Sequence, residues 1–377
     1  MKLLSVTFEG FRNLDNTQIH PCEGVNVIYG ENAQGKTNLI EAIWLLTGNK
    51  SFRGSLDKEM IGFDREFARI KASFFSQGRE QTAELVFMHG KKEAYLNGVK
   101  LTGASALYGN LFAVVFSPEH LSLVKNGPSE RRKFIDSAIC QIKPSYRDMI
   151  LMYNKTITQR NALLRDLPTN PGLYDTLSAW DERLASVGMG ITVVRNKYIK
   201  MLHKRASHYH EGISYGREKL SIEYSSAVDG LDDKTDEQVR ADLYALLKSK
   251  RREDTTYFTT SCGPHRDDIE ILINGEPARK FGSQGQQRSC VLSMKIAEEE
   301  LVKLASDEEP VVLLDDVLSE LDPQRQKFLL NEIGDRQVFI TCCESASATR
   351  LDGGKLFYVE NGRISEKNGE TQNDKVG

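Results

Sequence analysis

Residues 30–37 have the composition and spacing of a loop that binds phosphate groups. They match the pattern G-x-x-x-x-G-K-[ST]. In this pattern the glycines let backbone N–H groups approach the phosphates, the lysine reaches the β- and γ-phosphate oxygens, and the final hydroxyl binds Mg²⁺. We therefore expect Lys36 to act on the triphosphate and Thr37 to be a magnesium ligand. The residues expected to hold the nucleotide are Gly30, Glu31, Asn32, Ala33, Gln34, Gly35, Lys36 and Thr37.

A second group of reactive side chains is the acidic pair Asp315 and Asp316, which directly follows the apolar residues 311–314. Such a run predicts a strand buried on both faces of a parallel sheet, and this strand delivers the carboxylates to its C-terminal edge. There Asp315 would hold Mg²⁺ through its water shell, opposite Thr37. Asp316 would orient or deprotonate an attacking water. A surface acidic pair is the alternative, but the phosphate loop in the same chain favours the catalytic interpretation.

Residues 282–288 contain two glycines and small polar side chains just before a predicted helix. This arrangement predicts a second anion site at a helix N-terminus. Because the chain already has one such site for its own nucleotide, the simplest role of the second is to contact a nucleotide bound to another copy of the chain. The alternative is a plain glycine turn in which Ser283 is the N-cap of the helix.

Hydrophobic periodicity predicts the elements that position these groups. Residues 25–29 indicate a buried strand before the phosphate loop, and residues 38–46 indicate a helix after it, whose N-terminus faces the phosphates. A β-rich lobe is predicted by alternating segments at residues 3–8, 68–74 and 82–87 and by an Asn-Gly hairpin within residues 92–100. Residues 113–116 and 337–341 are short apolar strands, and we expect the first to be central in its sheet. A helix is expected over residues 288–304.

The middle of the chain is predicted to be helical. Apolar residues recur at steps of three and four within residues 135–153 and again, after a Pro- and Gly-containing breaker at residues 168–172, within residues 177–201. The second series is a heptad seam formed by Leu177, Trp180, Leu184, Val187, Ile191, Val194, Tyr198 and Met201. The short breaker predicts an antiparallel helical hairpin. Packing within this arm is the favoured role of the seam, and dimerisation through it is the alternative.

Composition limits the class of protein. The chain has 377 residues, 40% hydrophobic and 27% charged, which is ordinary for a globular protein with two or three structural units. No apolar run approaches the roughly 20 residues of a membrane helix, and no signal peptide is evident, so we expect an intracellular protein without membrane contact. The six cysteines show no zinc-binding spacing, which favours reduced, buried thiols. His265 is one histidine among mixed charges, which favours a polar network over a metal site.

The net charge of −3 is unevenly distributed. Residues 120–260 hold 23 Lys and Arg against 18 Asp and Glu, a balance of +5, whereas the remaining residues hold 27 against 35, a balance of −8. The middle of the chain is therefore the region where a polyanion would bind. Its basic runs lie at residues 197–205 and 248–252. The alternative is that these runs are solvated helix faces without a ligand.

Together these motifs resemble the ABC-type ATPases of the SMC/RecF superfamily. Four segments carry the resemblance. They are the phosphate loop, the signature Ser283-Gln284-Gly285-Gln286, the acidic pair, and the D-loop Ser319-Glu320-Leu321-Asp322. Residues 8–14, 116–119, 127–134 and 263–268 are similar to motifs of the RecF family, and the match extends to about residue 364. The short hairpin fits this family better than the SMC proteins, whose coiled coils are far longer. Gln284 replaces a usual signature glycine, and Asp316 replaces a usual glutamate.

The resemblance implies a fold, a function and further site residues. The fold would be α/β, an ABC-type P-loop ATPase head (mixed sheet plus β-rich lobe) with an inserted antiparallel helical hairpin domain. Arg12, Ser283, Gly285, Gln286 and Asp322 would join the nucleotide site, with Lys36, Asp315 and Asp316 catalytic and Thr37 and Asp315 on Mg²⁺. The residues that would contact DNA phosphates are Lys197, Lys200, Lys204, Arg205, Lys248, Lys250, Arg251 and Arg252.

The implied protein is a slow, switch-like ATPase that binds ATP and Mg²⁺ and dimerises on duplex or gapped DNA. It would act in recombinational repair, cytoplasmic and nucleoid-associated, with RecO and RecR as partners, and would assist loading of RecA. One alternative is the nucleotide-binding subunit of an ABC transporter, which should lack the helical hairpin. Another is a P-loop enzyme such as a nucleotide kinase, which leaves the signature segment without a role.

Four regions are expected. Residues 1–119 would be the N-terminal half of the ATPase lobe, and residues 120–258 the inserted helical arm domain. Residues 259–364 would be the C-terminal half of the lobe, with the signature, the acidic pair and the D-loop. Residues 365–377 would form a polar, disordered tail.

Overall fold

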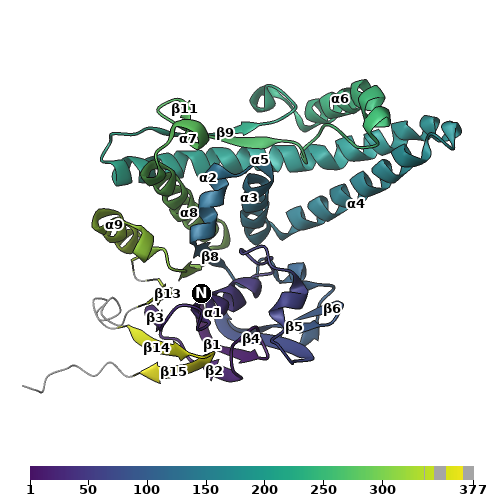
Figure 1. Cartoon of the computed structure of the whole chain (residues 1–377). Coiled ribbons are helices and arrows are strands. Elements are labelled where there is room, and N and C mark those ends of the chain that lie inside the picture. Colours follow the sequence, from purple (N-terminus) through teal and green to yellow (C-terminus); the bar gives the residue numbers. More distant parts are fainter. Residues whose placement is uncertain (335, 344–353, 368–377) are drawn as a thin grey trace, which may run out of the picture. The chain divides into compact units, whose positions relative to one another are not determined.

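The computed structural model describes residues 1–334, 336–343 and 354–367 (Figure 1). The chain forms two compact units: Met1–Leu121 with Lys295–Gly377, and Ser122–Met294. Helix α8 (Gln284–Ser306) begins in the second unit and ends in the first. No helix of the described residues is long and apolar enough to cross a membrane.

The core sheet of the first unit has the strand order β15-β14-β3-β13-β12-β8. Its strands are parallel except for β15, which pairs antiparallel with β14. The expectation that residues 113–116 form a central strand is wrong, because β8 lies at the edge of this sheet. The strands are β3 (Val25–Tyr29), β8 (Ala113–Phe116), β12 (Val311–Leu314), β13 (Val338–Cys342), β14 (Lys355–Glu360) and β15 (Arg363–Lys367).

The second sheet of this unit is the β-rich lobe, and it follows the order β2-β1-β4-β5-β6-β7 with antiparallel pairing. The predicted Asn-Gly turn joins β6 to β7, with Asn97 at φ 51° and Gly98 at φ 77°, as a tight hairpin requires. The strands are β1 (Lys2–Glu9), β2 (Thr17–Ile19), β4 (Phe67–Ser76), β5 (Arg79–Met88), β6 (Lys91–Leu96) and β7 (Val99–Lys100).

Helix α1 (Lys36–Leu45) belongs to the core of the first unit. Its side chains from Leu39 to Leu45 are all buried, and a helix that is buried all round lies inside a domain. Apolar side chains of both sheets join it in one core, among them Phe8, Phe74, Val115 and Phe339. The other helices of this unit are η1 (Asp57–Met60), η2 (Ala104–Leu107), η3 (Pro118–Leu121), η6 (Leu318–Glu320) and α9 (Pro323–Ile333).

The second unit contains the predicted helical hairpin, formed by α4 (Pro144–Asp166) and α5 (Leu177–Ser214), which run antiparallel (Figure 1). Most of the heptad seam is buried or half-buried within this unit, as packing in one arm requires, but Met201 is exposed. The remaining helices are α2 (Ser122–Lys125), α3 (Pro128–Ile142), η4 (Pro171–Thr176), η5 (Leu231–Asp233), α6 (Asp236–Tyr257) and α7 (Ala278–Phe281).

A buried charge network joins the three long helices of the arm. Arg160 of α4 is fully buried and donates to Asp181 of α5 at 2.8 Å and to Asp254 of α6 at 2.7 Å. Arg251 of α6 pairs with the other oxygen of Asp181 at 2.7 Å. Because buried charges are costly unless they are paired, these contacts fix how the three helices pack.

A small sheet of β9 (Leu220–Ser225), β10 (Asp268–Ile273) and β11 (Glu276–Pro277) completes the second unit. The expected division at residue 258 differs from the compact unit, which extends to Met294. The physical reason is that β10 pairs along its whole length with β9 from the arm. Residues 365–367, which were expected in the tail, belong to β15 instead, and the rest of that expectation, residues 368–377, lies outside the described residues.

Candidate nucleotide-binding site

The phosphate loop lies between β3 and α1, as its flanking sequence predicts. Gly30 and Gly35 have φ values of 151° and 118°, and Ala33 is also left-handed at 66°. A Cβ on Gly30 would lie 2.2 Å from the Val359 carbonyl oxygen, so only glycine fits there. Successive N–H groups in such a turn form an anion-binding concavity. Lys36 is buried, and its ammonium donates to the Gly30 and Glu31 carbonyls at 2.6 and 2.8 Å, which holds it at the loop.

The tertiary fold brings Asp315 to Thr37, 278 residues away in sequence. The Thr37 hydroxyl donates to Asp315 Oδ1 at 2.9 Å, and the Thr341 hydroxyl donates to the same oxygen at 3.1 Å. This contact follows from topology, because parallel strands deliver the residues after their C-terminal ends to one edge of the sheet.

Asp315 is an electrostatically unfavourable place for a negative charge. Burial raises the pKa of its carboxyl to about 6 despite the hydrogen bonds from Thr37 and Thr341, and the nearby charges of Glu119 and Asp316 raise it further. A carboxylate crowded in this way is stabilised by a cation. A hydroxyl beside a carboxylate suits Mg²⁺, which prefers oxygen ligands and retains waters. Thr37 and Asp315 could therefore hold this ion. Among the described residues no cluster of three or more His, Cys, Asp or Glu side chains forms a self-contained metal site.

Asp316 has a left-handed backbone, with φ 53°, and an exposed side chain. Its N–H donates to the Thr341 hydroxyl at 2.8 Å. The Ser319 hydroxyl lies 2.8 Å from the Asp316 carbonyl oxygen and 3.0 Å from Oδ1. The D-loop segment therefore orients the second carboxylate, next to the first.

Two other expected nucleotide residues have structural partners within this chain. Arg12 ion-pairs with the buried Glu41 of α1 at 2.7 Å and donates to the Ser55 hydroxyl at 2.8 Å. Asp322 is the N-cap of α9, where it accepts the N–H groups of Gln324 and Arg325. Hydrogen bonding and ion pairing with Arg325 lower the pKa of Asp322, although burial opposes the shift. The contact of either side chain with nucleotide stays a prediction.

Sequence reasoning missed Thr341 and Glu119 as members of the site. Each lies near the C-terminal end of an apolar strand of the core sheet. Thr341 is the second-last residue of β13, and Glu119 lies three residues after β8, whose partner is β12. Glu119 also accepts a hydrogen bond from Ser117. The available signal was the position of polar residues at the C-terminal ends of parallel strands.

The signature segment lies in the second unit. Ser283 is exposed, and its N–H donates to Gln286 Oε1 at 2.8 Å, while Gln286 N–H donates to the Ser283 hydroxyl at 3.3 Å. This reciprocal pair is a capping box at the start of α8, so Ser283 does cap the helix. Gly282 is sterically required, because a Cβ there would lie 2.6 Å from the Ala278 carbonyl oxygen. The capping box does not test whether Ser283, Gly285 and Gln286 contact a nucleotide, so that role stays a prediction.

The basic runs divide into exposed and engaged side chains. Lys197, Lys200 and Lys204 are exposed on one face of α5, although Lys200 also pairs with Asp232. Lys248 and Arg252 are exposed on α6, and Lys250 pairs with Glu253 at 2.7 Å. Arg205 is half-buried. Arg251 pairs with Asp181 in the charge network of the arm, so its guanidinium is engaged there and the expected phosphate contact is not supported.

His265 lies in a polar network rather than a metal site in the described structure. His265 Nε2 donates to the Thr260 carbonyl oxygen at 3.0 Å, and its Nδ1 lies 3.1 Å from the Tyr153 hydroxyl. Burial lowers the pKa of His265 to about 4.

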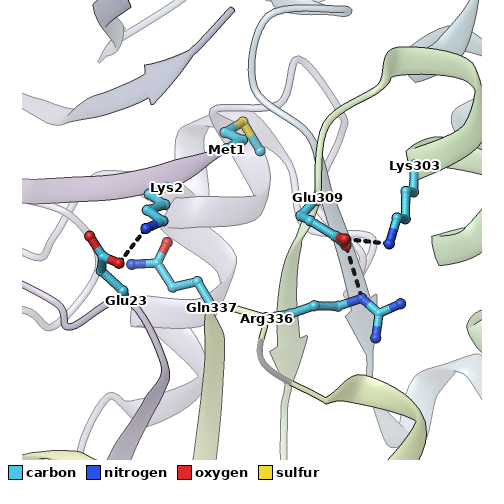
Figure 2. A pocket seen from close by; sticks show the side chains of 7 residues that line it. All are labelled: Met1, Lys2, Glu23, Lys303, Glu309, Arg336 and Gln337. Atoms are coloured by element: carbon cyan, nitrogen blue, oxygen red, sulfur yellow. Dashed lines mark hydrogen bonds and ion pairs between the residues drawn. The ribbon is translucent and has the colours of Figure 1, made fainter. Parts of the chain in front are cut away.

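A pocket of about 330 Å³ lies elsewhere in the first unit (Figure 2). Glu309, Gln337 and Glu23 line it, and each precedes the N-terminal end of a parallel strand. The pocket is therefore at the opposite edge of the sheet from the phosphate loop. Figure 2 shows Lys2 paired with Glu23, and Arg336 and Lys303 paired with Glu309. Its cations are thus neutralised by carboxylates.

Comparison with known proteins agrees with this architecture. The model of the RecF/RecN/SMC N-terminal domain matches residues 2–365. The DNA replication and repair protein RecF of Ruminiclostridium cellulolyticum is 43% identical over 370 residues, which cover 97% of this chain and 99% of that protein. A solved structure of the recombination mediator protein RecF with ATP, in the RecFOR pathway, superposes with a TM-score of 0.91 at 37% identity, covering 97% of this chain and 98% of that one.

More distant structures share the fold alone. The Smc head domain from Pyrococcus furiosus, bound to part of ScpA, superposes with a TM-score of 0.55 at 15% identity over 97% of this chain and 96% of that chain. The expected ABC-type ATPase fold is thus confirmed. With the phosphate loop, the Thr37–Asp315 contact and the signature at the start of α8 all present, the chain belongs to the RecF family.

Proposed function

We propose that this chain is an ATP-dependent, dimerising DNA-binding protein of recombinational and replication-gap repair. The observation that carries the proposal is the Thr37–Asp315 contact beside the phosphate loop, at 2.9 Å. This contact brings together, from two distant segments, a hydroxyl and a carboxylate of the kind that bind Mg²⁺. Membership in the RecF family supports the DNA-repair role.

At the nucleotide site each residue has a distinct task. Lys36 would neutralise the β- and γ-phosphates, and the N–H groups of the loop would bind phosphate oxygens. Thr37 and Asp315 would hold Mg²⁺, which supplies charge neutralisation at the phosphates. Asp316, oriented by Ser319, would position the attacking water and accept its proton. Slow hydrolysis by these groups would make ATP a switch.

The second anion site would act on another copy of the chain. Ser283 is exposed at the N-terminus of the 23-residue helix α8, where helix N–H groups and the dipole favour an anion. Capping the partner's nucleotide in this way would couple ATP binding to dimerisation. The dimer would then bring two basic arms to one duplex, and RecO and RecR are the partners that the family suggests, with RecA loaded afterwards.

The test is ATP-driven dimerisation followed by complementation. Lys36→Met should abolish productive ATP binding, whereas Ser283→Arg should bind ATP and fail to dimerise, because a bulky cation cannot enter the cap. Mixing the two variants leaves one composite site with an intact phosphate loop and an intact signature. ATP turnover should therefore return in the mixture, measured with each variant alone as control. Normal ATP-driven dimerisation of Ser283→Arg would refute capping in trans.

A further inference from the structure

We propose that Glu218 and His210 are positioning residues for the signature segment. They would hold Gln286, and through it Ser283, in the geometry that caps a nucleotide on a second copy of the chain. The inference rests on the proposed function and adds two residues that neither the motifs nor the composition pointed to.

A chain of side-chain contacts connects Gln286 of the signature through Glu218 to the buried His210 of α5. Gln286 Nε2 donates to Glu218 Oε1 at 3.0 Å. The other oxygen of Glu218 lies 3.1 Å from His210 Nε2, and His210 is fully buried. His210 Nδ1 faces the hydroxyl of Ser293, on the same helix as the signature, at 3.4 Å. All four residues belong to the second unit.

The Gln286 amide is the part of the signature that these contacts fix. Its Oε1 accepts the Ser283 N–H in the capping box, and its Nε2 donates to a carboxylate that has no proton to give when ionised. Rotating the amide by half a turn would place its oxygen against Glu218 and its NH₂ against the Ser283 N–H. Glu218 therefore reinforces the amide orientation that the capping box uses.

Glu218 is itself held by the backbone. Helix α5 ends at Ser214, and Tyr215 follows in the left-handed conformation. The Ser214 hydroxyl lies 3.4 Å from both the N–H and the carbonyl oxygen of Glu218. Lys219 N–H donates to Asn274 Oδ1 at 2.8 Å, which ties the same loop to the turn after β10. The carboxylate therefore approaches α8 from a fixed direction.

His210 is the second hydrogen-bond partner of the Glu218 carboxylate. The Ser293 hydroxyl lies 2.8 Å from the Ser289 carbonyl oxygen, to which it donates, so it presents an acceptor to His210 Nδ1. Both ring nitrogens then face oxygen atoms, which holds the imidazole between Glu218 and Ser293. The Glu218 charge also reaches α8 itself, since it adds to the burial that raises the pKa of Cys290 to about 12. The carboxylate of Glu218 makes the hydrogen bond from Gln286 charge-assisted and strong.

The test uses the complementing mixture, because it separates the chain that supplies the signature from the chain that supplies the phosphate loop. Glu218→Ala is added either to the Lys36→Met chain, whose signature is the one in use, or to the Ser283→Arg chain, whose signature is already inactive. ATP turnover should fall at least about 10-fold in the first placement, the loss expected for a charge-assisted hydrogen bond. In the second placement it should change by less than about twofold.

Two further variants sharpen the result. Glu218→Gln keeps an acceptor for Gln286 and should retain at least about a third of the turnover, because the amide orientation is preserved. Glu223→Ala, which removes an exposed carboxylate on the neighbouring β9, is the matched control and should have no effect in either chain. If Glu218→Ala does not fold, as judged by thermal melting, His210→Phe in the signature-supplying chain replaces it and should lower turnover in that placement only.

Two outcomes would overturn the inference. Equal losses in both placements would mean that Glu218 matters only for stability, and unchanged turnover in the signature-supplying chain would mean that the cap forms without it. Failure of the proposed function looks different, because the mixture without any Glu218 change would then show no turnover.

Discussion

Buried charge is compensated differently in the nucleotide site and in the helical arm. In the arm, Arg160 and Arg251 are matched by Asp181 and Asp254, all within hydrogen-bond distance. In the nucleotide site, Asp315 receives two hydroxyl donors, and the charges of Glu119 and Asp316, which raise its pKa, have its own sign.

The difference separates a structural charge cluster from a binding one. A network in which opposite charges balance needs no ligand for its charge, although breaking it leaves an uncompensated charge. An acidic cluster supported only by hydroxyls is under-compensated until a cation binds. Charge balance within the fold thus indicates which cluster acts on a ligand, which counting charged residues does not.

The largest effect is expected when a carboxylate is removed from the buried charge network of the arm. Asp181→Ala should lower the free energy of unfolding by roughly 3–5 kcal/mol, because the buried Arg160 and the half-buried Arg251 lose a shared carboxylate. Chemical denaturation of the whole chain measures this change. Glu182→Ala is the matched control: the neighbouring residue makes an exposed ion pair with Arg240, which should contribute less than about 1 kcal/mol. Similar losses for both variants would end the distinction between buried and exposed pairs.

Neutralising the under-compensated carboxylate should have the opposite effect on folding. Asp315→Asn should leave the melting temperature unchanged or higher at neutral pH, since it removes a buried charge that burial and its neighbours disfavour. It should nevertheless weaken Mg²⁺-dependent ATP binding by about 10-fold or more. Asp316→Asn is the control, because it should retain ATP binding and slow hydrolysis. Marked destabilisation by Asp315→Asn without magnesium would contradict the proposed cation site.

Glu299 and Arg336 form a third charge cluster, and the pH dependence of protein stability tests how far its charge is compensated. Burial raises the pKa of Glu299 to about 7, although Arg336 lies 2.7 Å away. The unfolded chain then loses this proton near pH 4.5 and the folded chain near pH 7, so stability falls as pH rises through that window. Glu299→Gln should remove this fall and be more stable above pH 7, by roughly 1–3 kcal/mol. Denaturation midpoints between pH 4 and 8 measure it, with Glu300→Gln as control. A pH dependence that survives Glu299→Gln would assign the effect to another group.

The smallest effect is expected for each exposed cation of the arm. Charge reversal of Lys197, Lys204, Lys248 or Arg252 should weaken duplex DNA binding several-fold, nearly uniformly over sequences, while ATP binding is kept. Each lost phosphate contact should also flatten the plot of log affinity against log salt by about one unit. Lys71→Glu, on an exposed position of β4, is the control. Unchanged affinity and slope would make these residues ordinary solvated positions and move the DNA site to the other unit.

The sequence alone determined the local parts of the molecule. The phosphate loop needs glycine at positions 30 and 35, and the apolar runs before and after it predicted β3 and α1 closely. The heptad seam predicted α5, and the Asn-Gly pair predicted the β6–β7 hairpin. These features could be read because each depends on backbone conformation or on periodicity within one short segment.

Only the tertiary structure decided which distant side chains meet. Sequence patterns could not show that β8 is an edge strand, that Glu119 and Thr341 join Asp315, or that Arg251 of a basic run pairs with the buried Asp181. Nor could they connect Gln286 to Glu218 and His210, which lie 68 and 76 residues earlier in the chain. The physical reason is that pairing and burial of charge depend on strand order and helix packing, and a single segment of sequence contains neither.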